Sequence, residues 1–443
     1  MKFTRSISVI ALAAVFSGAG VAAHADAASD GPTTYFVSGA GADTNTGLAP
    51  DQAFRSIQRA SDLTEPGDTV EIMDGEYADT SGQGVLRITR SGTLDAPITY
   101  RAYHNQTPVI RPVTGWNGVS LVGASHIVLD GLEIRGNADN LTLEDATANA
   151  SPGKATYNQN CVHARKNAAG ERWSHLTVIN SHIYDCPGGG LSTTGGDYIT
   201  FADNVVHSNA WYSVYANSGI SILTPEDVDD ATGYKIRIEN NVSYDNESKV
   251  KWIACNCISD GNGIIVDSTL NARSSGGVDY KGRTLVANNV VFDNGGTGIH
   301  AYRSANVDIL NNTGYLNSRS PFINNPNISA FVSRDVRVIN NVSVTLPGKP
   351  SNSAYRNENV LYDYNTYWGG AEPEVLGAND LIVDPEFVAP STDPAVADFR
   401  LTRGSPAGDT GIALPEVTDD FDGKKRPSGS AFDRGAFELR GRH

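Results

Sequence analysis

The chain has 443 residues, of which 34 are Lys or Arg and 50 are Asp or Glu, so its formal net charge is −16. This acidic balance argues against nucleic acid as a partner, because binding to a phosphate backbone needs a basic surface. An acidic glycan is less favoured but still allowed, since a few local cations or a bridging Ca²⁺ can override the net field. The 45 glycines, among many Asn and Asp, indicate a β protein rich in turns.

The first residues have the pattern of a secretory signal peptide, residues 1–25. Lys2 and Arg5 precede an apolar run, and a small-x-small triplet indicates cleavage before Asp26. No later segment is apolar over enough residues to cross a bilayer, and no lipidation motif is present. We therefore expect a secreted, extracellular protein without a membrane partner, in which residues 26–33 form a linker.

Residues 34–110 are expected to form an N-terminal cap and the first repeats. Residues 54–63 predict a short amphipathic helix with Ile57, Ala60 and Leu63 on one face. Such a helix would cover the open edge of the first repeat, which otherwise exposes unpaired backbone groups. Strands are predicted at 34–37, 69–73, 86–89 and 98–101.

A two-part unit repeats through residues 111–370. One part is a glycine followed by a short apolar strand, as at 263–266, and the other is a strand that ends in asparagine, as at 285–289. Each unit is too short to bury its apolar face alone, so the units must stack as the rungs of a solenoid. Identical amides in a buried column can hydrogen-bond from rung to rung, and we expect such an asparagine ladder. Its members are Asn204, Asn241, Asn289, Asn312 and Asn341.

Loops of unequal length interrupt the repeats at 138–160, 224–234 and 271–281, and loops of this kind usually wall a groove on one side of the stack. After Trp368 the repeats fade, and residues 371–443 are expected to form a C-terminal cap segment.

Four cysteines in an exported chain favour structural disulfides, although a zinc site is a less favoured alternative because no usual ligand spacing is present. Three pairings are possible, and the sequence does not choose among them. The cysteines are Cys161, Cys186, Cys255 and Cys257.

Four stretches and the asparagine column resemble the secreted right-handed parallel β-helix proteins of the pectate-lyase-like superfamily. The stretches are YFVSGAGADTNTG with PDQAFRSIQRASDLTEPGDTVEIMDGEY, GTLDAPITYRAY, DFDGKKRP and DRGAFE. The resemblance implies an all-β fold, a single right-handed parallel β-helix with an N-terminal helical cap. A capped solenoid of this kind is expected to be a monomer. The resemblance does not fix the function, because the superfamily contains polysaccharide lyases, glycoside hydrolases, epimerases and binding proteins.

Alternation along each glycine-led strand turns the second and fourth residues after the glycine outward. One predicted outward column contains His163, Ser192, Ser221, Ile265 and His300, and the other contains Arg165, Thr194, Leu223, Asp267 and Tyr302. At about 4.8 Å per rung, Asp267 lies one rung from His300 and Tyr302. His163 and Arg165 lie three rungs from Asp267, about 14 Å away, and are expected to contact a different sugar unit.

The first functional hypothesis is a polysaccharide lyase that cleaves an extracellular, uronate-containing polysaccharide by β-elimination. This reaction needs the substrate carboxylate neutralised by Ca²⁺ or arginine, and a base that removes the C5 proton. Lys281 is the expected base, with Arg283 nearby to lower its pKa, and His300 or Tyr302 is the alternative. In the resembling calcium-dependent pectate lyases, the base is a Lys or Arg beside a cluster of Asp.

The same hypothesis assigns a possible calcium site and further substrate contacts. Asp260, Asp267 and Asp293 offer the oxygen ligands that Ca²⁺ prefers. Substrate contacts are expected from Arg283, Arg303, His163, Arg165 and Trp211. The plainer interpretation is that Asp260 and Asp293 form tight turns and that Lys281 and Arg283 belong to a solvated loop.

Two alternatives remain open. A glycoside hydrolase would use Asp260 and Asp267 as its paired carboxylates, and their spacing permits either the short or the long separation that such enzymes use. A non-catalytic glycan-binding or surface protein would use only contacts to sugar rings. Aromatic residues that suit all three hypotheses are Trp211, Tyr212, Tyr215, Trp252 and Tyr302.

Overall fold

The computed structural model describes residues 31–79, 82, 84–104, 106–274 and 276–439. The predicted signal peptide and residues 26–30 of the predicted linker lie outside these residues. In the part of the chain that is described, no helix combines the length and the apolar character needed to span a membrane.

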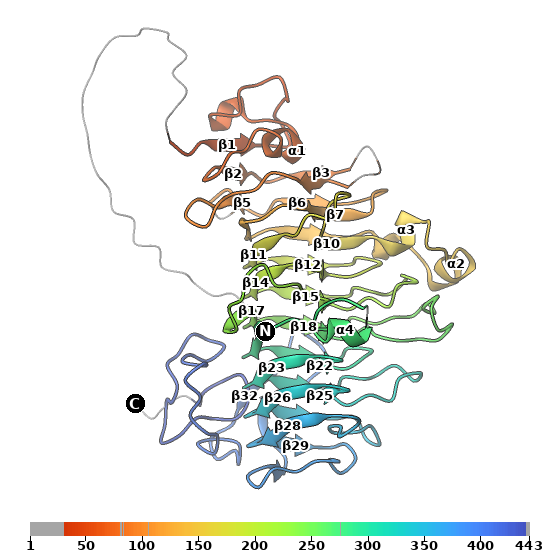
Figure 1. The fold of residues 1–443 in the computed structure, drawn as a ribbon, viewed down its shortest axis with the longest axis vertical. Helices are drawn as coiled ribbons and strands as arrows, with labels where there is room; N and C mark the ends of the chain where they lie inside the picture. The colour runs from red at the N-terminus through yellow and green to blue at the C-terminus, as the bar shows by residue number, and fades with distance from the viewer. Residues whose placement is uncertain (1–30, 80–81, 83, 105, 275, 440–443) are drawn as a thin grey trace, which may run out of the picture.

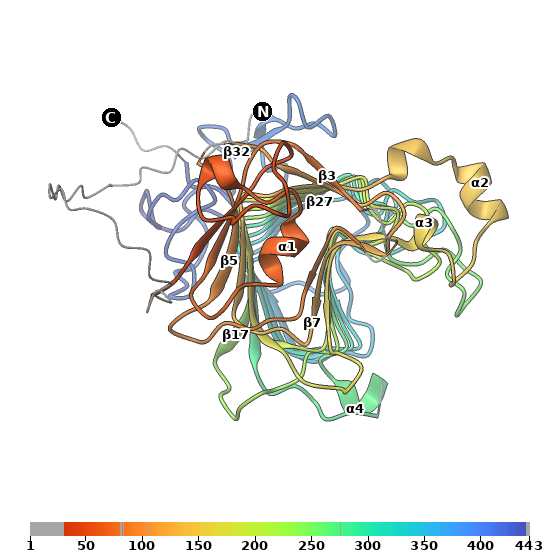
Figure 2. The same cartoon turned by 90° about the horizontal axis from the view of Figure 1, so that it is seen from above.

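The fold is a right-handed parallel β-helix, as the sequence predicts. The chain visits three long parallel sheets in turn, and most coils add one strand to each sheet (Figure 1). Seen along the stack, the sheets enclose the apolar core as the sides of a prism (Figure 2). Short strands fold this way because their inward side chains, such as Val178, Ile183 and Leu191, are buried only when neighbouring rungs cover them.

Sheet 1 has eleven strands: β1 (Thr34–Val37), β2 (Thr69–Ile72), β5 (Ile98–Ala102), β8 (Ile127–Asp130), β11 (Ser174–Ile179), β14 (Asp197–Ala202), β17 (Tyr234–Glu239), β20 (Arg283–Ala287), β23 (Ala305–Leu310), β26 (Arg334–Ile339) and β28 (Glu358–Asp363). Sheet 2 also has eleven: β3 (Glu76–Ala78), β6 (Val109–Arg111), β9 (Glu133–Arg135), β12 (His182–Tyr184), β15 (Val205–His207), β18 (Val242–Tyr244), β21 (Val290–Phe292), β24 (Thr313–Tyr315), β27 (Val342–Val344), β29 (Thr366–Trp368) and β30 (Leu381–Ile382).

Sheet 3 has eight strands, and its outer face forms the floor of the site described below: β4 (Leu86–Ile88), β7 (Asn117–Val122), β10 (Asn160–Arg165), β13 (Leu191–Thr194), β16 (Ile220–Leu223), β19 (Ile264–Asp267), β22 (Ile299–Tyr302) and β25 (Ile328–Phe331). The remaining elements are the antiparallel pair β31 (Phe387–Ala389) and β32 (Asp398–Leu401) and the short helices η1 (Pro50–Gln52), α1 (Ile57–Ser61), η2 (Ala138–Asn140), α2 (Leu143–Ala148), α3 (Ala155–Asn158) and α4 (Asn271–Ser274).

The predicted asparagine ladder is confirmed. It lies in the turn between sheets 1 and 2, where each amide nitrogen donates to the amide oxygen of the next rung at 2.9–3.0 Å. The ladder continues one rung further than predicted, from Asn341 to Asn365 at 3.0 Å. All of its members are buried, so these hydrogen bonds satisfy turn groups that have no access to water.

A second ladder, which the sequence analysis missed, follows sheet 2. The amides of Asn209, Asn246, Asn294 and Asn317 connect successive rungs at 2.7–3.1 Å. Each of these asparagines comes five residues after a member of the first ladder, from Asn204 onward. That spacing is visible in the sequence and could have predicted the second ladder.

The N-terminal helix is shorter than predicted. Phe54 forms a bridge with Val37 of sheet 1 and is therefore extended, so the helix begins only at Ile57 and ends at Ser61. Ile57 and Ala60 are buried, as the amphipathic pattern predicts. The role of this helix as a cap stays a prediction.

The C-terminal segment lies beside the last rungs (Figure 1). It contacts the turns between sheets 1 and 2, where the Asn288 side chain donates to the Asp419 carbonyl at 2.7 Å and that of Asn311 to the Asp433 carbonyl at 2.9 Å. A buried ion pair between Arg426 and Glu438, 2.6 Å, stabilises the segment internally.

The cysteine pairing, which the sequence left open, is Cys161–Cys186 and Cys255–Cys257. Both pairs are disulfides, so the cysteines do not form the alternative zinc site. The first bridge is buried inside the stack, whereas the second lies on an exposed loop.

Candidate functional site

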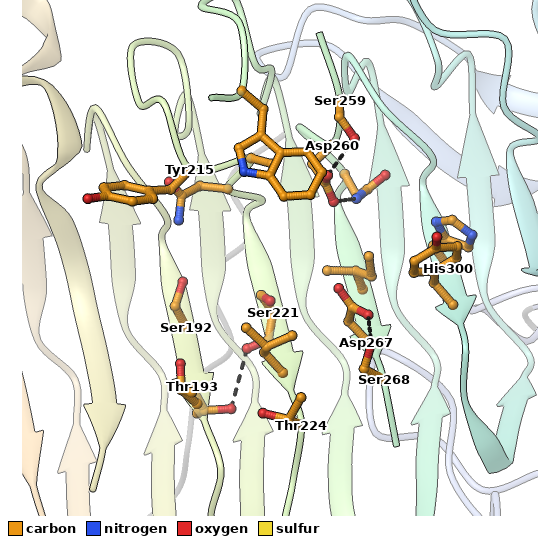
Figure 3. A pocket seen from close by; sticks show the side chains of 18 of the residues that line it. Ser192, Thr193, Tyr215, Ser221, Thr224, Ser259, Asp260, Asp267, Ser268 and His300 are labelled. Atoms are coloured by element: carbon orange, nitrogen blue, oxygen red, sulfur yellow. Dashed lines mark hydrogen bonds between the residues drawn. The ribbon is translucent and has the colours of Figure 1, made fainter. Parts of the chain in front are cut away.

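A cavity of about 1000 Å³ lies on the outer face of sheet 3 (Figure 3). Its floor is formed by outward side chains of strands β10, β13, β16, β19 and β22, and its walls by the loops that flank these strands. Of the three predicted loops, 138–160 contributes lining residues and 224–234 contributes Thr224, whereas no described residue of 271–281 lines the cavity. The loop at 245–263, which the sequence analysis did not single out, contributes the largest share of the wall, from Trp252 to Asn262.

The two predicted outward columns are confirmed by the strand register. His163 is paired with Ser192, and the column continues through Ser221 and Ile265 to His300. The second column brings Asp267 next to Tyr302 on the neighbouring strand. Because alternate side chains of a strand face opposite ways, the same pattern that buries the core places these groups in the cavity.

Asp260 lies in the turn before β19 and points into the cavity (Figure 3). Its carboxylate accepts hydrogen bonds from the Ser259 hydroxyl at 2.8 Å and from the Asn262 amide at 3.0 Å. Burial raises the pKa of Asp260 to about 7, and the nearby negative charge of Asp267 adds to this effect. Its φ of 64° also makes it a turn residue, so the structural and chemical interpretations of this position coexist.

Asp267 ends β19 and points into the same cavity (Figure 3). Burial raises its pKa as well, but two groups oppose this effect: the Ser268 hydroxyl, which donates to the carboxylate at 2.7 Å, and the positive charge of Arg303. No cation in the described part of the chain lowers the pKa of Asp260 in this way. The two carboxyl groups of one cavity therefore have different environments.

Two histidines lie at opposite ends of the cavity floor. Burial lowers the pKa of both His163 and His300 to about 4, so both are neutral at pH 7. The His163 Nε2 lies 3.3 Å from the Thr194 hydroxyl. The ring of His300 lies against the ring of Tyr302, with centroids 5.4 Å apart. Neutral imidazoles in these positions are able to accept a proton, or a hydrogen bond from a sugar hydroxyl.

Arg165 and Arg303 line the cavity, and within the described residues neither guanidinium has a carboxylate within ion-pair distance. The Arg303 guanidinium lies 5.0 Å from the centre of the Tyr302 ring. Most other arginines that the structure describes, such as Arg283 and Arg337, do pair with acidic groups. These two arginines therefore offer cationic groups to a ligand of the cavity in an otherwise acidic protein.

Two further polar atoms of the cavity have no partner among the described residues. They are the Ser192 hydroxyl and the Asn217 amide oxygen, which are buried in residues that line the cavity. Buried polar groups are normally satisfied, so these atoms are suited to bind ligand hydroxyls.

Lys281, the predicted base, does not line this cavity. It lies on an exposed loop, where its ammonium group contacts Asp230 at 2.7 Å, and this contact raises its pKa instead of lowering it. Arg283 begins β20 in sheet 1 and pairs with Asp308, so it does not lower the pKa of Lys281. The prediction failed because the connection at 268–282 leads the chain from β19 in sheet 3 to β20 in sheet 1, away from the cavity.

Asp293 and Trp211 also lie outside the cavity. Asp293 follows β21 of sheet 2, is paired with Arg319 at 2.6 Å, and has a φ of 52° that makes it a turn former. The Trp211 indole N–H donates to the Asp245 carbonyl at 3.0 Å, and the Lys249 ammonium group covers its ring.

The three predicted calcium ligands therefore do not meet. Among the residues that the structure describes, no cluster of three or more His, Cys, Asp or Glu side chains could hold a metal ion. Calcium binding itself stays a prediction.

Several lining residues escaped the sequence analysis. Ser259, Asn262 and Ser268 flank the two aspartates directly in the chain, and their hydrogen-bonding side chains were a usable signal. Phe331 extends the second column by one rung beyond Tyr302 and could have been found by continuing the alignment. Trp116 precedes β7 in an irregular loop and offered no periodic signal.

The comparisons with known proteins agree with this architecture. A protein of Bacillus subtilis (strain 168), the uncharacterised YwoF, is 28% identical over 359 residues, covering 63% of this chain and 72% of that protein. The crystal structure of pectate lyase Pel9A superposes with a TM-score of 0.54 at 16% identity, over 93% of this chain and 97% of that chain. GH136 lacto-N-biosidase from Eubacterium ramulus superposes with a TM-score of 0.45 at 18% identity, over 76% of this chain and 56% of that chain.

At 16% identity the match to the Pel9A structure establishes the fold alone. Residues 35–329 match the family described as Pel9A-like, right handed beta helix region, which agrees with the resemblance found in the sequence. This chain therefore belongs to the Pel9A-like family of right-handed β-helix proteins.

Proposed function

We propose that this protein is a glycoside hydrolase that cleaves an acidic extracellular polysaccharide bound along the outer face of sheet 3. The observation that supports this proposal most directly is the pair of carboxyl groups, Asp260 and Asp267, in one cavity with different environments. Pairs of titratable groups whose surroundings separate their pKa values mark acid and base roles. The pattern of a signal peptide at residues 1–25 supports export to such a substrate.

In this proposal Asp260 is the general acid. A carboxyl group with a pKa of about 7 is still protonated in a large fraction of the molecules at neutral pH and can transfer this proton to the glycosidic oxygen as the bond to the anomeric carbon breaks. The Ser259 and Asn262 side chains that donate to this carboxyl group stabilise the carboxylate that remains.

Asp267 then acts as the anionic partner. The positive charge of Arg303 and the hydroxyl of Ser268 favour its ionised form. As a carboxylate it can attack the anomeric carbon or remove a proton from an attacking water. The configuration of the product's anomeric carbon reports which of these two reactions occurs.

The substrate class is inferred from Arg165 and Arg303. Unpaired guanidinium groups recognise carboxylates through two parallel hydrogen bonds, so acidic sugar units are the proposed ligands. The two arginines lie on or directly after β10 and β22, four rungs apart, or about 19 Å at strand spacing. A polymer that reaches both must extend along the stack.

A polysaccharide lyase is the second candidate, favoured by the juxtaposition of Arg303, His300 and Tyr302 beside Asp267. In β-elimination Arg303 would neutralise the uronate carboxylate, and the neutral His300 would remove the C5 proton. The leaving oxygen would receive a proton from Asp260 or Tyr302.

The two candidates differ in their products. Hydrolysis releases new reducing ends without a double bond, whereas elimination creates an unsaturated uronide that absorbs in the near ultraviolet. We expect new reducing ends from polygalacturonate, alginate or another uronate polymer, and no unsaturated product.

Asp260→Asn and Asp267→Asn should each lower turnover by at least about a hundredfold, because general acid or nucleophilic assistance is lost. Asp51→Asn, at an exposed position in η1, is the control and should keep full activity. Detection of an unsaturated product would refute the hydrolase proposal and support the lyase candidate. Binding without either product would refute both and leave a glycan-binding protein.

A further inference from the structure

One wall of the cavity is aromatic. Trp116, Tyr215 and Trp252 all line it, and each belongs to a loop that precedes a strand of sheet 3. The side chains of Trp116 and Tyr215 are 37% and 42% exposed, and Trp252 is half-buried. Rings that are half open to a cavity can cover the apolar face of a sugar.

Trp252 differs from the other two because its hairpin contains a disulfide. Its backbone N–H donates to the Cys257 carbonyl at 2.9 Å, and its carbonyl accepts from the Asn256 N–H at 2.8 Å. Cys255 and Cys257 form a disulfide within this hairpin. Ile253 connects it to the loop of Tyr215, because its N–H donates to the Val214 carbonyl at 3.2 Å.

The indole of Trp252 is available for a ligand. Within the described residues it has no hydrogen-bond, aromatic or cationic partner, whereas the indole N–H of Trp173 donates to the Thr194 carbonyl at 3.3 Å. The Trp211 indole is likewise occupied, by a backbone carbonyl and by a lysine. A partnerless indole beside a cavity offers both a stacking surface and one free donor.

The second disulfide contributes little to the stability of the whole fold. It closes a loop between residues only two apart in sequence, while Cys161–Cys186 spans 25 residues and is buried. A bridge stabilises a fold mainly by restricting the unfolded chain, and this effect grows with loop length. The restriction imposed by Cys255–Cys257 is therefore local, on the hairpin that contains Trp252.

We propose that Trp252 is a sugar-stacking residue of this cavity and that the Cys255–Cys257 disulfide holds its hairpin in the stacking position. This inference rests on the proposed glycan-cleaving function and adds to it a binding subsite that depends on the disulfide. The ligand is a sugar unit of the same polysaccharide, because Trp252 lines the cavity that contains Asp260 and Asp267.

The disulfide and the catalytic acid share one loop, but they are held separately. After the hairpin, the Gly261 N–H donates to the Asn217 carbonyl at 2.8 Å, and the Gly261 carbonyl accepts from the Gly296 N–H at 2.9 Å. These bonds fix the backbone beside Asp260 without help from the bridge. Loss of the bridge should therefore weaken substrate binding and raise KM, with kcat unchanged.

The test compares Trp252→Ala and the double variant Cys255→Ser/Cys257→Ser with the wild type. Trp368→Ala is the matched control, because Trp368 is exposed at the end of β29 in sheet 2 and does not line the cavity. Binding is measured as retardation in gels that contain polygalacturonate, alginate or arabinogalactan, and KM and kcat are measured on the polymer that is cleaved.

Both variants should weaken binding by a similar factor, about two- to tenfold for one aromatic contact, with unchanged kcat and melting temperature. Brief treatment of the wild type with a thiol, followed by alkylation, should label only the two exposed cysteines and cause the same loss. This second measurement does not depend on folding of the double variant.

Other results would contradict the proposal in distinguishable ways. If Trp252→Ala binds as well as the wild type, the stacking subsite is wrong. If Trp252→Ala is weakened but the double variant and the reduced protein are not, the role of the disulfide is wrong. If no polymer retards the wild type and none is cleaved, the proposed function fails, and this subsite fails with it.

Discussion

Removal of one rung of the first asparagine ladder should destabilise the protein strongly. The Asn289 side chain takes part in five hydrogen bonds: it accepts from the backbone and side-chain nitrogens of Asn241 and donates to Ile238, Ala287 and Asn312. Asn289 is 0% exposed, so water does not replace these partners. Each buried group left unsatisfied costs about 1–3 kcal/mol.

Because some of the freed groups keep a second partner, we expect Asn289→Ala to lower the free energy of unfolding by about 3–5 kcal/mol in total. The entropy of unfolding is about 2.1 cal/mol/K per residue, so for about 400 folded residues 1 kcal/mol corresponds to about 1.2 °C. The melting temperature should therefore fall by about 4–6 °C, measured by circular dichroism or calorimetry.

Asn140→Ala is the control, because Asn140 is exposed in η2 and its two side-chain hydrogen bonds compete with water. It should change the melting temperature by less than about 1 °C. If Asn289→Ala lowers the melting temperature no more than Asn140→Ala does, the hydrogen bonds of the ladder do not stabilise the stack.

Three further predictions concern the charged groups. The pKa of Asp260 rises from about 3.9 in the unfolded chain to about 7 on folding, so the folded state binds a proton more tightly and stability should fall as pH rises from about 4 to 7. Asp260→Asn should flatten this part of the plot of unfolding free energy against pH. An unchanged slope would contradict the burial of the carboxyl group. Lys281→Ala should leave turnover unchanged, because the residue pairs with Asp230 outside the cavity; lost turnover would restore it as the base. Arg303→Ala should weaken binding of uronate polymers and move the acidic limb of the pH–rate profile upward, because its charge lowers the pKa of Asp267; a neutral polymer should bind as before.

The sequence predicted best what repeats. The glycine-led strands and the asparagine column follow from a fixed relation between neighbouring rungs, so aligning the segments was enough to place Asp267 beside Tyr302 and to separate His163 from Asp267 by three rungs. The N-terminal helix was less well predicted, because pairing of Phe54 with sheet 1 overrode its amphipathic pattern.

The sequence by itself therefore determined the fold class, the register of sheet 3 and the column that contains Asp267 and His300, since side-chain alternation is a local property of a strand. Only the tertiary structure decided which charges share the cavity. The tertiary structure placed Lys281, Arg283 and Asp293 away from Asp260, and it placed Trp252 in the same cavity as Asp260, because corners and loops of unequal length set the direction of the chain. It also decided the disulfide pairing, because the distance between two cysteines in space does not follow from their spacing along the chain.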